Sequence, residues 1–132
     1  MIVLDTHVWV WWLSNPEKLT ARARRTIMEA AGDRAIYISA ISAWEIALLA
    51  YRGRLTFTMD AQDWIAKSEA LPFLHFVPVD NAIAVRSVRL TEPFHSDPAD
   101  RIIVATAIIM GAPVVTSDTK IAKYPHVNSI WK

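Results

Sequence analysis

Four acidic side chains have the residue type and spacing to build a divalent-cation site. They are Asp5, Glu45, Asp100 and Asp118. Four carboxylates in one pocket, without a matching ring of Lys and Arg, would repel one another strongly. A divalent cation removes that conflict, and carboxylate oxygens and water are the ligands that Mg²⁺ and Mn²⁺ prefer. One or two such ions can activate water and stabilise charge on a phosphate group, which is hydrolytic chemistry on a phosphodiester.

The other metal-binding residue types do not form a zinc pattern. The chain has no cysteine, so a thiolate site and a disulfide framework are both excluded. The histidines show no short ligand spacing, which argues against zinc. They are His7, His75, His95 and His126.

Each acid also has a purely structural explanation. Glu45 follows Ser42 at the spacing of a capping box, and Asp100 would lie in the first turn of a helix. Asp118 could be a turn residue or a helix cap. Asp5 is the hardest to explain in this way, because an acid directly after a buried apolar strand is costly to bury unless it is paired or metal-bound.

The elements that must position these acids alternate between strand and helix. Short apolar runs predict strands at 2–4, 35–38, 76–79, 112–116 and 127–131, and Pro78 limits the third of them to a short length or a sheet edge. Helical spacing with start and stop signals predicts helices or helical turns at 6–13, 15–32, 42–53, 60–70, 81–90, 98–111 and 118–123. This alternation predicts an α/β fold, a three-layer sandwich with a mainly parallel central sheet.

A parallel sheet would bring the four acids to one edge. Asp5 closes the first strand and Asp118 follows the fourth, so both should emerge at the carboxyl ends of the strands. Glu45 and Asp100 would lie in first helical turns, which face the same edge. We therefore expect four carboxylates that are far apart in the sequence to converge.

The length and composition of the chain limit its domain count and its cellular location. The chain of 132 residues is 53% apolar with a net charge of +1, which predicts a single domain over residues 1–132. No apolar run is long enough to span a membrane, and the acid at position 5 interrupts any export signal. With the lack of cysteine, these features favour a cytoplasmic location.

Four sequence blocks carry a resemblance to a known family. They are IVLDT at 2–6, SAISAWEI at 39–46, HSDPADRIIVATA at 95–107 and VVTSD at 114–118. In their order and spacing the chain resembles the PIN-domain family, and within it the VapC-type toxins of bacterial and archaeal toxin–antitoxin pairs. The resemblance spans essentially the whole chain, and four blocks in register make it specific.

The resemblance implies a metal-dependent endoribonuclease that hydrolyses RNA with a metal-activated water and binds Mg²⁺ or Mn²⁺ in an acidic pocket. Carried over to this chain, Asp5 and Asp100 look like the principal metal ligands. Glu45 looks like the third acid of the pocket. Asp118 looks like the fourth, which is the most variable member in such proteins.

Four further residues are candidates for supporting roles. Asp97 could join the pocket, although its place before a proline favours a helix N-cap. Thr6 and Thr116 look like hydroxyls that orient the carboxylates or a water, and they could equally be turn residues. Arg101 could touch a phosphate or pair with a pocket acid, and the sequence does not separate these two roles.

The expected partners follow from the same resemblance and from the surface. VapC-type toxins imply an RNA substrate, a homodimer and a cognate antitoxin whose tail blocks the active site. Six tryptophans are many for one small core, so some could lie at an interface. Two basic groups, either of which could guide RNA or simply be a solvated helix face, are Lys18, Arg22 and Arg25, and Arg52 with Arg54.

Other functions fit the sequence less well. A PIN-domain nuclease for RNA processing or for DNA is the main alternative. A receiver-like phosphoacceptor module would need an acceptor Asp after a middle strand, and residues 38–39 are Ile and Ser. A PIN-like binding domain without catalysis is disfavoured because the set of acids is complete.

Overall fold

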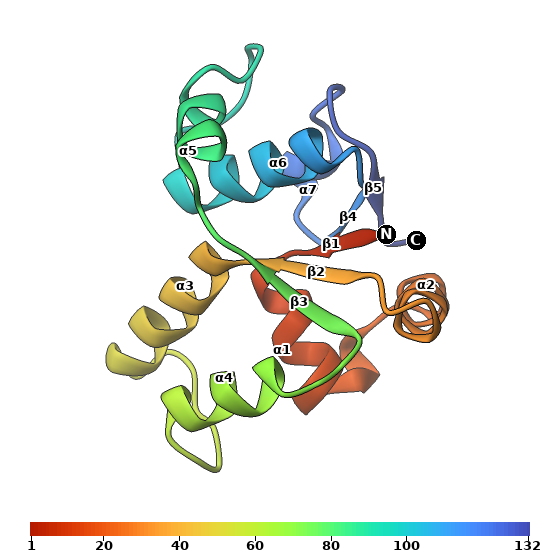
Figure 1. The fold of residues 1–132 in the computed structure, drawn as a ribbon, viewed down its shortest axis with the longest axis vertical. Coiled ribbons are helices and arrows are strands. Elements are labelled where there is room, and N and C mark those ends of the chain that lie inside the picture. The colour runs from red at the N-terminus through yellow and green to blue at the C-terminus, as the bar shows by residue number, and fades with distance from the viewer.

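The computed structural model describes residues 1–132, which form a five-stranded parallel sheet between two layers of helices (Figure 1). The strand order is β3-β2-β1-β4-β5. The strands are β1 (Ile2–Leu4), β2 (Ile36–Ser39), β3 (Leu74–Val77), β4 (Val114–Val115) and β5 (Ser129–Ile130). The predicted α/β sandwich is confirmed, and the sheet is parallel throughout.

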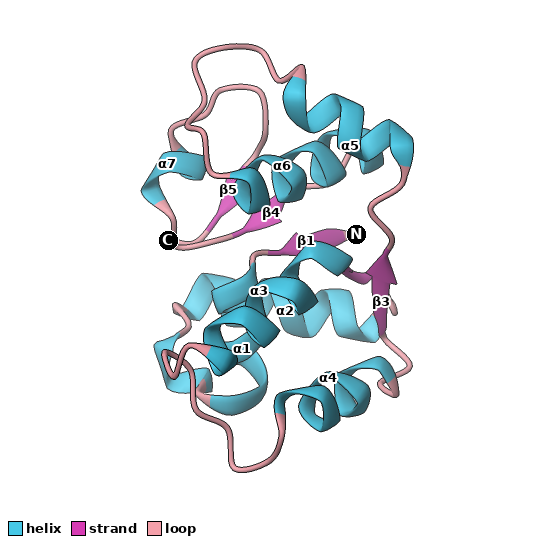
Figure 2. Cartoon of the chain, turned by 90° about the vertical axis from the view of Figure 1, so that its left-hand side faces the viewer, coloured by secondary structure: helices cyan, strands magenta, loops and turns pink.

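The helices divide into two groups, one on each face of the sheet (Figure 2). One face carries α1 (Thr6–Ser14), α2 (Ala21–Gly32), α3 (Ala40–Tyr51) and α4 (Ala61–Glu69). The other face carries α5 (Asn81–Val88), α6 (Pro98–Met110) and α7 (Thr119–Ala122). None of the helices has the length and apolar run that a membrane span requires.

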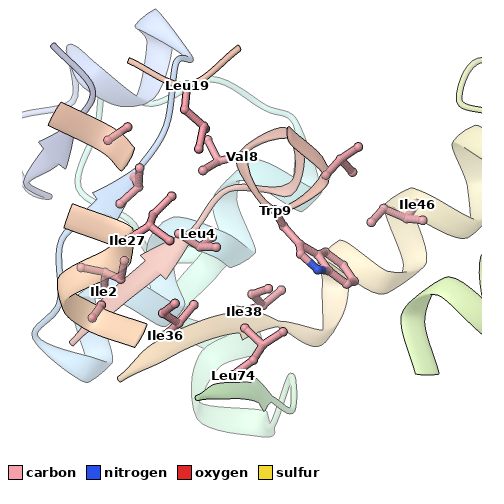
Figure 3. Packing of buried hydrophobic residues seen from close by; sticks show 14 of the residues in the cluster. Ile2, Leu4, Val8, Trp9, Leu19, Ile27, Ile36, Ile38, Ile46 and Leu74 are labelled. Carbon is pink, nitrogen blue, oxygen red and sulfur yellow. The ribbon is translucent and has the colours of Figure 1, made fainter. Parts of the chain in front are cut away.

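Strand β1 lies at the centre and is buried on both faces. Ile2 and Leu4 point into the cluster beneath α1 and α2, where Figure 3 shows them beside Ile27. Val3, between them in sequence, packs on the opposite face against Ile103 of α6. This alternation follows from the two-residue period of a strand, and burial of both faces explains the continuous apolar run.

The tryptophans divide between core and surface. Trp9 is fully buried in the core (Figure 3). Its ring centroid lies 4.9 Å from that of Trp64 and 5.3 Å from that of Phe76. Its indole Nε1 donates to Ser68 Oγ at 3.2 Å, so the buried N–H is satisfied. Trp44 is 56% exposed on α3. Trp9 and Trp64 therefore belong to the core, whereas Trp44 is exposed and free to contact a partner.

The structure moves the start of one predicted helix and the bounds of one predicted strand. Asn15 and Pro16 open a 3₁₀ turn (Pro16–Lys18), and not the long helix predicted from residue 15. That helix, α2, begins at Ala21, because the Thr20 hydroxyl accepts the Ala23 N–H at 3.0 Å and forms the stronger cap. Strand β3 lies at the edge of the sheet, as expected, but it covers Leu74–Val77 and not the predicted 76–79, because Pro78 has no N–H to continue the pairing.

The strand order reverses at β1, and this reversal decides where a site can form. The chain runs outward from β1 to β2 and β3, then crosses through α5 and α6 to β4 on the other side of β1. Loops therefore leave in opposite directions beyond the carboxyl ends of β1 and β4. Figure 1 shows α1, α3 and α6 beginning near this edge.

Candidate metal centre

Asp5 is buried at the carboxyl end of β1, with only 7% of its surface exposed. Its Oδ1 accepts the Thr6 N–H at 2.8 Å, which makes it the N-cap of α1. Its Oδ2 accepts the Thr116 hydroxyl at 2.7 Å, across the pair formed by β1 and β4. Two hydrogen bonds fix the orientation of this carboxylate. Both donors are neutral, so they do not compensate the negative charge of Asp5.

Glu45 reaches the same edge from α3. Its Oε1 accepts the Thr6 hydroxyl at 2.5 Å, and Thr6 Oγ1 also lies 2.8 Å from the buried Ser42 Oγ. The predicted capping box is wrong. The helix begins at Ala40, with the Ser39 hydroxyl accepting the Ile41 N–H, so Glu45 lies in the second turn and not in the first. Its side chain is therefore free to face Thr6.

Asp100 lies in the first turn of α6, as predicted. Asp97 is the N-cap of this helix, because its Oδ1 accepts the Asp100 N–H at 3.0 Å, and it is exposed. Pro98 occupies the first helical position, where its missing N–H costs nothing. The packing of α3 against α6 brings Glu45 and Asp100 to the same edge.

Asp118 joins the site through β4. Its Oδ1 accepts the Lys120 N–H at 2.8 Å, so it caps α7, as the structural explanation held. Its own N–H donates to Thr116 Oγ1 at 2.9 Å, and Thr116 in turn donates to Asp5. Thr116 thus connects Asp118 to Asp5, which is the supporting position considered for it.

Three of the four carboxylates of the site have raised pKa values. Burial raises the pKa of Asp5 above its usual value, and the hydrogen bonds from Thr116 and Thr6 lower it only in part. The pKa of Asp100 is raised to about 8, first by burial and then by repulsion. The repelling carboxylates are those of Asp5, Asp97, Asp118 and Glu45.

The pKa of Glu45 is also raised above its usual value. Burial raises its pKa, and the Thr6 hydrogen bond opposes that effect. No Lys or Arg forms an ion pair with any of the four acids. A cluster of carboxylate oxygens that is costly to ionise and has no Lys or Arg partner fits a hard divalent cation such as Mg²⁺ or Mn²⁺.

The structure adds one residue that the sequence did not indicate. His95 Nε2 lies 3.1 Å from Asp100 Oδ2. Ligand atoms of His95, Asp100 and Asp118 all lie within 4.8 Å of one another. The only signal in the sequence was the position of His95, five residues before Asp100, and this spacing has no regular structural meaning.

Arg101 bonds to backbone carbonyls and pairs with none of the four pocket acids, so one of the two roles considered for it is not observed. Its Nε donates to Ser87 O at 2.8 Å, and its Nη1 donates to Phe94 O at 3.2 Å and to His95 O at 3.1 Å. The one carboxylate near it is that of Glu92, at 3.9 Å. Arg101 therefore holds the loop before α6 onto α5.

The two basic groups lie in different places. Helix α2 lies near the amino ends of the strands, away from the acids, and its Arg22 donates to Lys132 O at 2.7 Å (Figure 1). Arg52, in contrast, lines a groove beside the acids. The groove is formed by α3 and the start of α6, and its other lining residues are Trp44, Glu45, Leu48, Leu49, Asp97, Pro98 and Ala99.

Comparison with known proteins agrees with this architecture. A family model described as PIN domain matches residues 2–127. Ribonuclease VapC22 from Mycobacterium tuberculosis (strain ATCC 25618 / H37Rv) is 34% identical over 132 residues, which cover 98% of each chain. This relationship leaves the receiver-like alternative without support.

Solved structures share the fold at lower identity. A VapBC2 structure from Rickettsia felis, bound to a DNA fragment from the promoter, has a TM-score of 0.73 at 17% identity, with 100% of each chain covered. FitAcB from Neisseria gonorrhoeae has a TM-score of 0.67 at 23% identity, with 98% of this chain and 96% of that chain covered. The strand order, the acidic edge and the relative of similar length lead to one conclusion: the chain belongs to the PIN-domain family, in its VapC-type branch.

Proposed function

We propose that this protein is a metal-dependent endoribonuclease and the toxin of a toxin–antitoxin pair. The observation that carries the proposal is the convergence of four carboxylates at the reversal of strand order, where no Lys or Arg forms an ion pair with them. Membership in the VapC-type branch supports ribonuclease activity, because the relative of similar length is described as a ribonuclease. In this proposal residues 1–132 act as one nuclease domain.

The proposed ligands of Mg²⁺ or Mn²⁺ are Asp5, Glu45, Asp100 and Asp118, with Asp5 and Asp100 as the principal two. The bound ion would supply activation of a water molecule and charge stabilisation at the phosphate. Thr116 and Thr6 hold the Asp5 and Glu45 carboxylates in place. Asp97 has its Oδ1 occupied by the α6 cap, which supports a structural role for it.

The groove beside the acids has the chemistry to accept a single strand of RNA. Trp44 exposes 56% of its surface there, enough for a base to stack on its indole. Arg52 lines the same groove and can pair with a phosphate. Glu45 lines the same groove, so a strand bound there would pass the acids.

The products of cleavage test the proposed chemistry directly. Attack by water with the 3′-oxygen as the leaving group breaks the P–O3′ bond and should leave a 5′-phosphate and a 3′-hydroxyl, because the nucleophile is water and not the RNA's own 2′-hydroxyl. Mass spectrometry of cleaved, end-labelled oligoribonucleotides identifies the ends, with a 2′-deoxy strand of the same sequence as the comparison. A 2′,3′-cyclic phosphate would overturn the hydrolytic mechanism, and equal cleavage of the deoxy strand would overturn the assignment as a ribonuclease.

Thr116→Val should weaken Mn²⁺ binding by about 10–100-fold, because a residue that orients a metal-binding carboxylate typically contributes that much to affinity. The exchange preserves volume at a position that is 1% exposed and removes the hydroxyl that donates to Asp5. Isothermal titration with Mn²⁺ measures the change. Thr106→Val is the matched control, because the buried Thr106 hydroxyl donates only to Ile102 O within its own helix. Equal affinities for Thr116→Val and wild type would contradict the role of Thr116.

The proposed partners are a cognate antitoxin and a second copy of this chain. VapBC2 and FitAcB share the fold of this protein, which supports an antitoxin partner of that kind. Co-expression with the product of a small neighbouring gene, followed by size-exclusion chromatography with light scattering, tests both partners. A monomer that no neighbouring gene product binds would contradict this part of the proposal.

A further inference from the structure

The loop between α5 and α6 carries His95 into the edge of the acid cluster. Its Nε2 is shielded from solvent and lies 3.1 Å from Asp100 Oδ2, yet the contact lacks the angles of a full hydrogen bond. No other group satisfies this nitrogen. A shielded polar atom without a partner is costly, so its placement against a carboxylate calls for an explanation.

The other ring nitrogen shows which tautomer the site favours. His95 Nδ1 faces the backbone N–H of Asp97 at 3.4 Å, and a backbone N–H can only donate. A neutral imidazole has one N–H and one acceptor nitrogen, so acceptance at Nδ1 places the hydrogen on Nε2. The Nε2–H is then the group that meets Asp100.

The backbone around His95 is held from two sides. Arg101 donates to the carbonyl oxygens of Phe94 and His95, and through Nε to Ser87 O on α5. The Phe94 ring packs 4.6 Å from the His95 ring and 4.7 Å from the ring of Tyr124. The imidazole is therefore presented to Asp100 by a fixed loop.

From this geometry we infer that His95 is a positioning residue that donates its Nε2–H to Asp100 and orients this carboxylate for the divalent cation, without itself binding the ion. The inference rests on the proposed metal site. Donation to Oδ2 holds the carboxylate and leaves Oδ1 available for the ion. A small rotation of the Asp100 side chain brings the 3.1 Å contact into alignment, and such contacts commonly tighten when a site is loaded.

Direct ligation by His95 is the competing arrangement. It would require a lone pair on Nε2 and therefore a hydrogen on Nδ1, where it would oppose the Asp97 N–H. Histidines that ligate metals normally donate their second ring N–H to an acceptor, and here a donor occupies that place. The two arrangements thus differ in tautomer and in whether nitrogen bonds to the ion.

Two measurements on the wild-type protein separate them. ¹⁵N NMR of the ring nitrogens in the metal-free protein should show the hydrogen of His95 on Nε2. Pulsed EPR of the Mn²⁺-loaded protein should show no coupling from a directly bonded imidazole nitrogen. A hydrogen on Nδ1, or a directly bonded nitrogen, would overturn the inference.

Substitution then measures the contribution of the donor. His95→Phe should weaken Mn²⁺ binding by about 10–100-fold, because it keeps a ring but removes the N–H. His95→Gln places an amide N–H near the position of Nε2 and should restore most of the affinity. His126→Phe is the control. His126 is exposed, and the ring that it packs against is that of Tyr124, which is not one of the proposed metal ligands.

The outcomes distinguish this inference from the proposed function. If wild type binds Mn²⁺ and His95→Phe binds it equally well, only the positioning role fails. If His95→Phe and His95→Gln weaken binding equally, the donor is not what matters and the inference also fails. If the wild-type protein binds neither Mn²⁺ nor Mg²⁺ in calorimetry, the proposed metal site fails, and the positioning role fails with it.

Discussion

Asp5→Asn is expected to lower the rate of RNA cleavage by about 10³-fold or more while leaving the fold intact. A bound divalent cation contributes several kcal/mol to transition-state stabilisation, and each 1.36 kcal/mol is a factor of about ten in rate. The substitution removes the negative charge at the central position of the cluster. It preserves the cap of α1, because an asparagine side chain keeps an oxygen that can accept the Thr6 N–H.

The measurement is single-turnover cleavage with Mg²⁺ and with Mn²⁺, accompanied by circular dichroism and thermal unfolding. Asp60→Asn is the matched control. Asp60 is the N-cap of α4 and accepts the Gln62 N–H, but it lies outside the acid cluster. This control should cleave at the wild-type rate. Native-rate cleavage by Asp5→Asn would refute the assignment of the metal site.

Asp100→Asn should abolish cleavage to a similar extent and, without metal, make the folded protein more stable at alkaline pH. The pKa of Asp100 is raised from its usual 3.8 to about 8, first by burial and then by the neighbouring carboxylates. The folded chain therefore holds this proton more tightly than the unfolded chain. The stabilisation is fully present below about pH 4 and is lost as the pH rises through about 8.

An asparagine at position 100 has no proton to lose, so this decline should be absent from the variant. Thermal unfolding of the metal-free proteins between about pH 5 and about pH 9 measures it, at roughly 3–6 °C for each kcal/mol in a chain of this size. Added Mn²⁺ should raise the melting temperature of the wild type, because only the folded state binds the ion well. The same addition should have much less effect on the variant.

Parallel curves of melting temperature against pH for wild type and Asp100→Asn would contradict the electrostatic account. Asp97→Asn provides the comparison, because Asp97 is an exposed N-cap whose side-chain oxygen accepts the Asp100 N–H. Its replacement keeps that acceptor and should preserve most of the pH dependence. A gain of stability confined to Asp100→Asn would be the mark of an acid retained for function at the expense of stability.

Much of the fold was readable from local patterns. The run from Ile2 to Leu4 predicted the central strand, because a strand buried on both faces must be apolar at every position. Asp97 and Pro98 predicted the start of α6, and Gly111 its end. Gly111 has a φ of 67°, a left-handed conformation that glycine adopts without a Cβ clash.

Local signals misled where two caps competed over a few residues. Ser42 and Glu45 match a capping box, yet Ser39 caps α3. The start of this helix is set by where β2 stops pairing with β3, at Ser39 and Val77. That pairing is a tertiary fact, and it puts Glu45 in the second turn, where its carboxylate meets Thr6.

The sequence by itself determined which acids could meet, since their residue types and their places at the ends of predicted elements were sufficient to propose a site. Only the tertiary structure decided that His95 approaches Asp100 and that Arg101 bonds to backbone carbonyls. The physical reason is the range of each signal. Strand periodicity and helix caps act within a few residues, whereas the path of the loop before α6 depends on its packing against α5 and Tyr124.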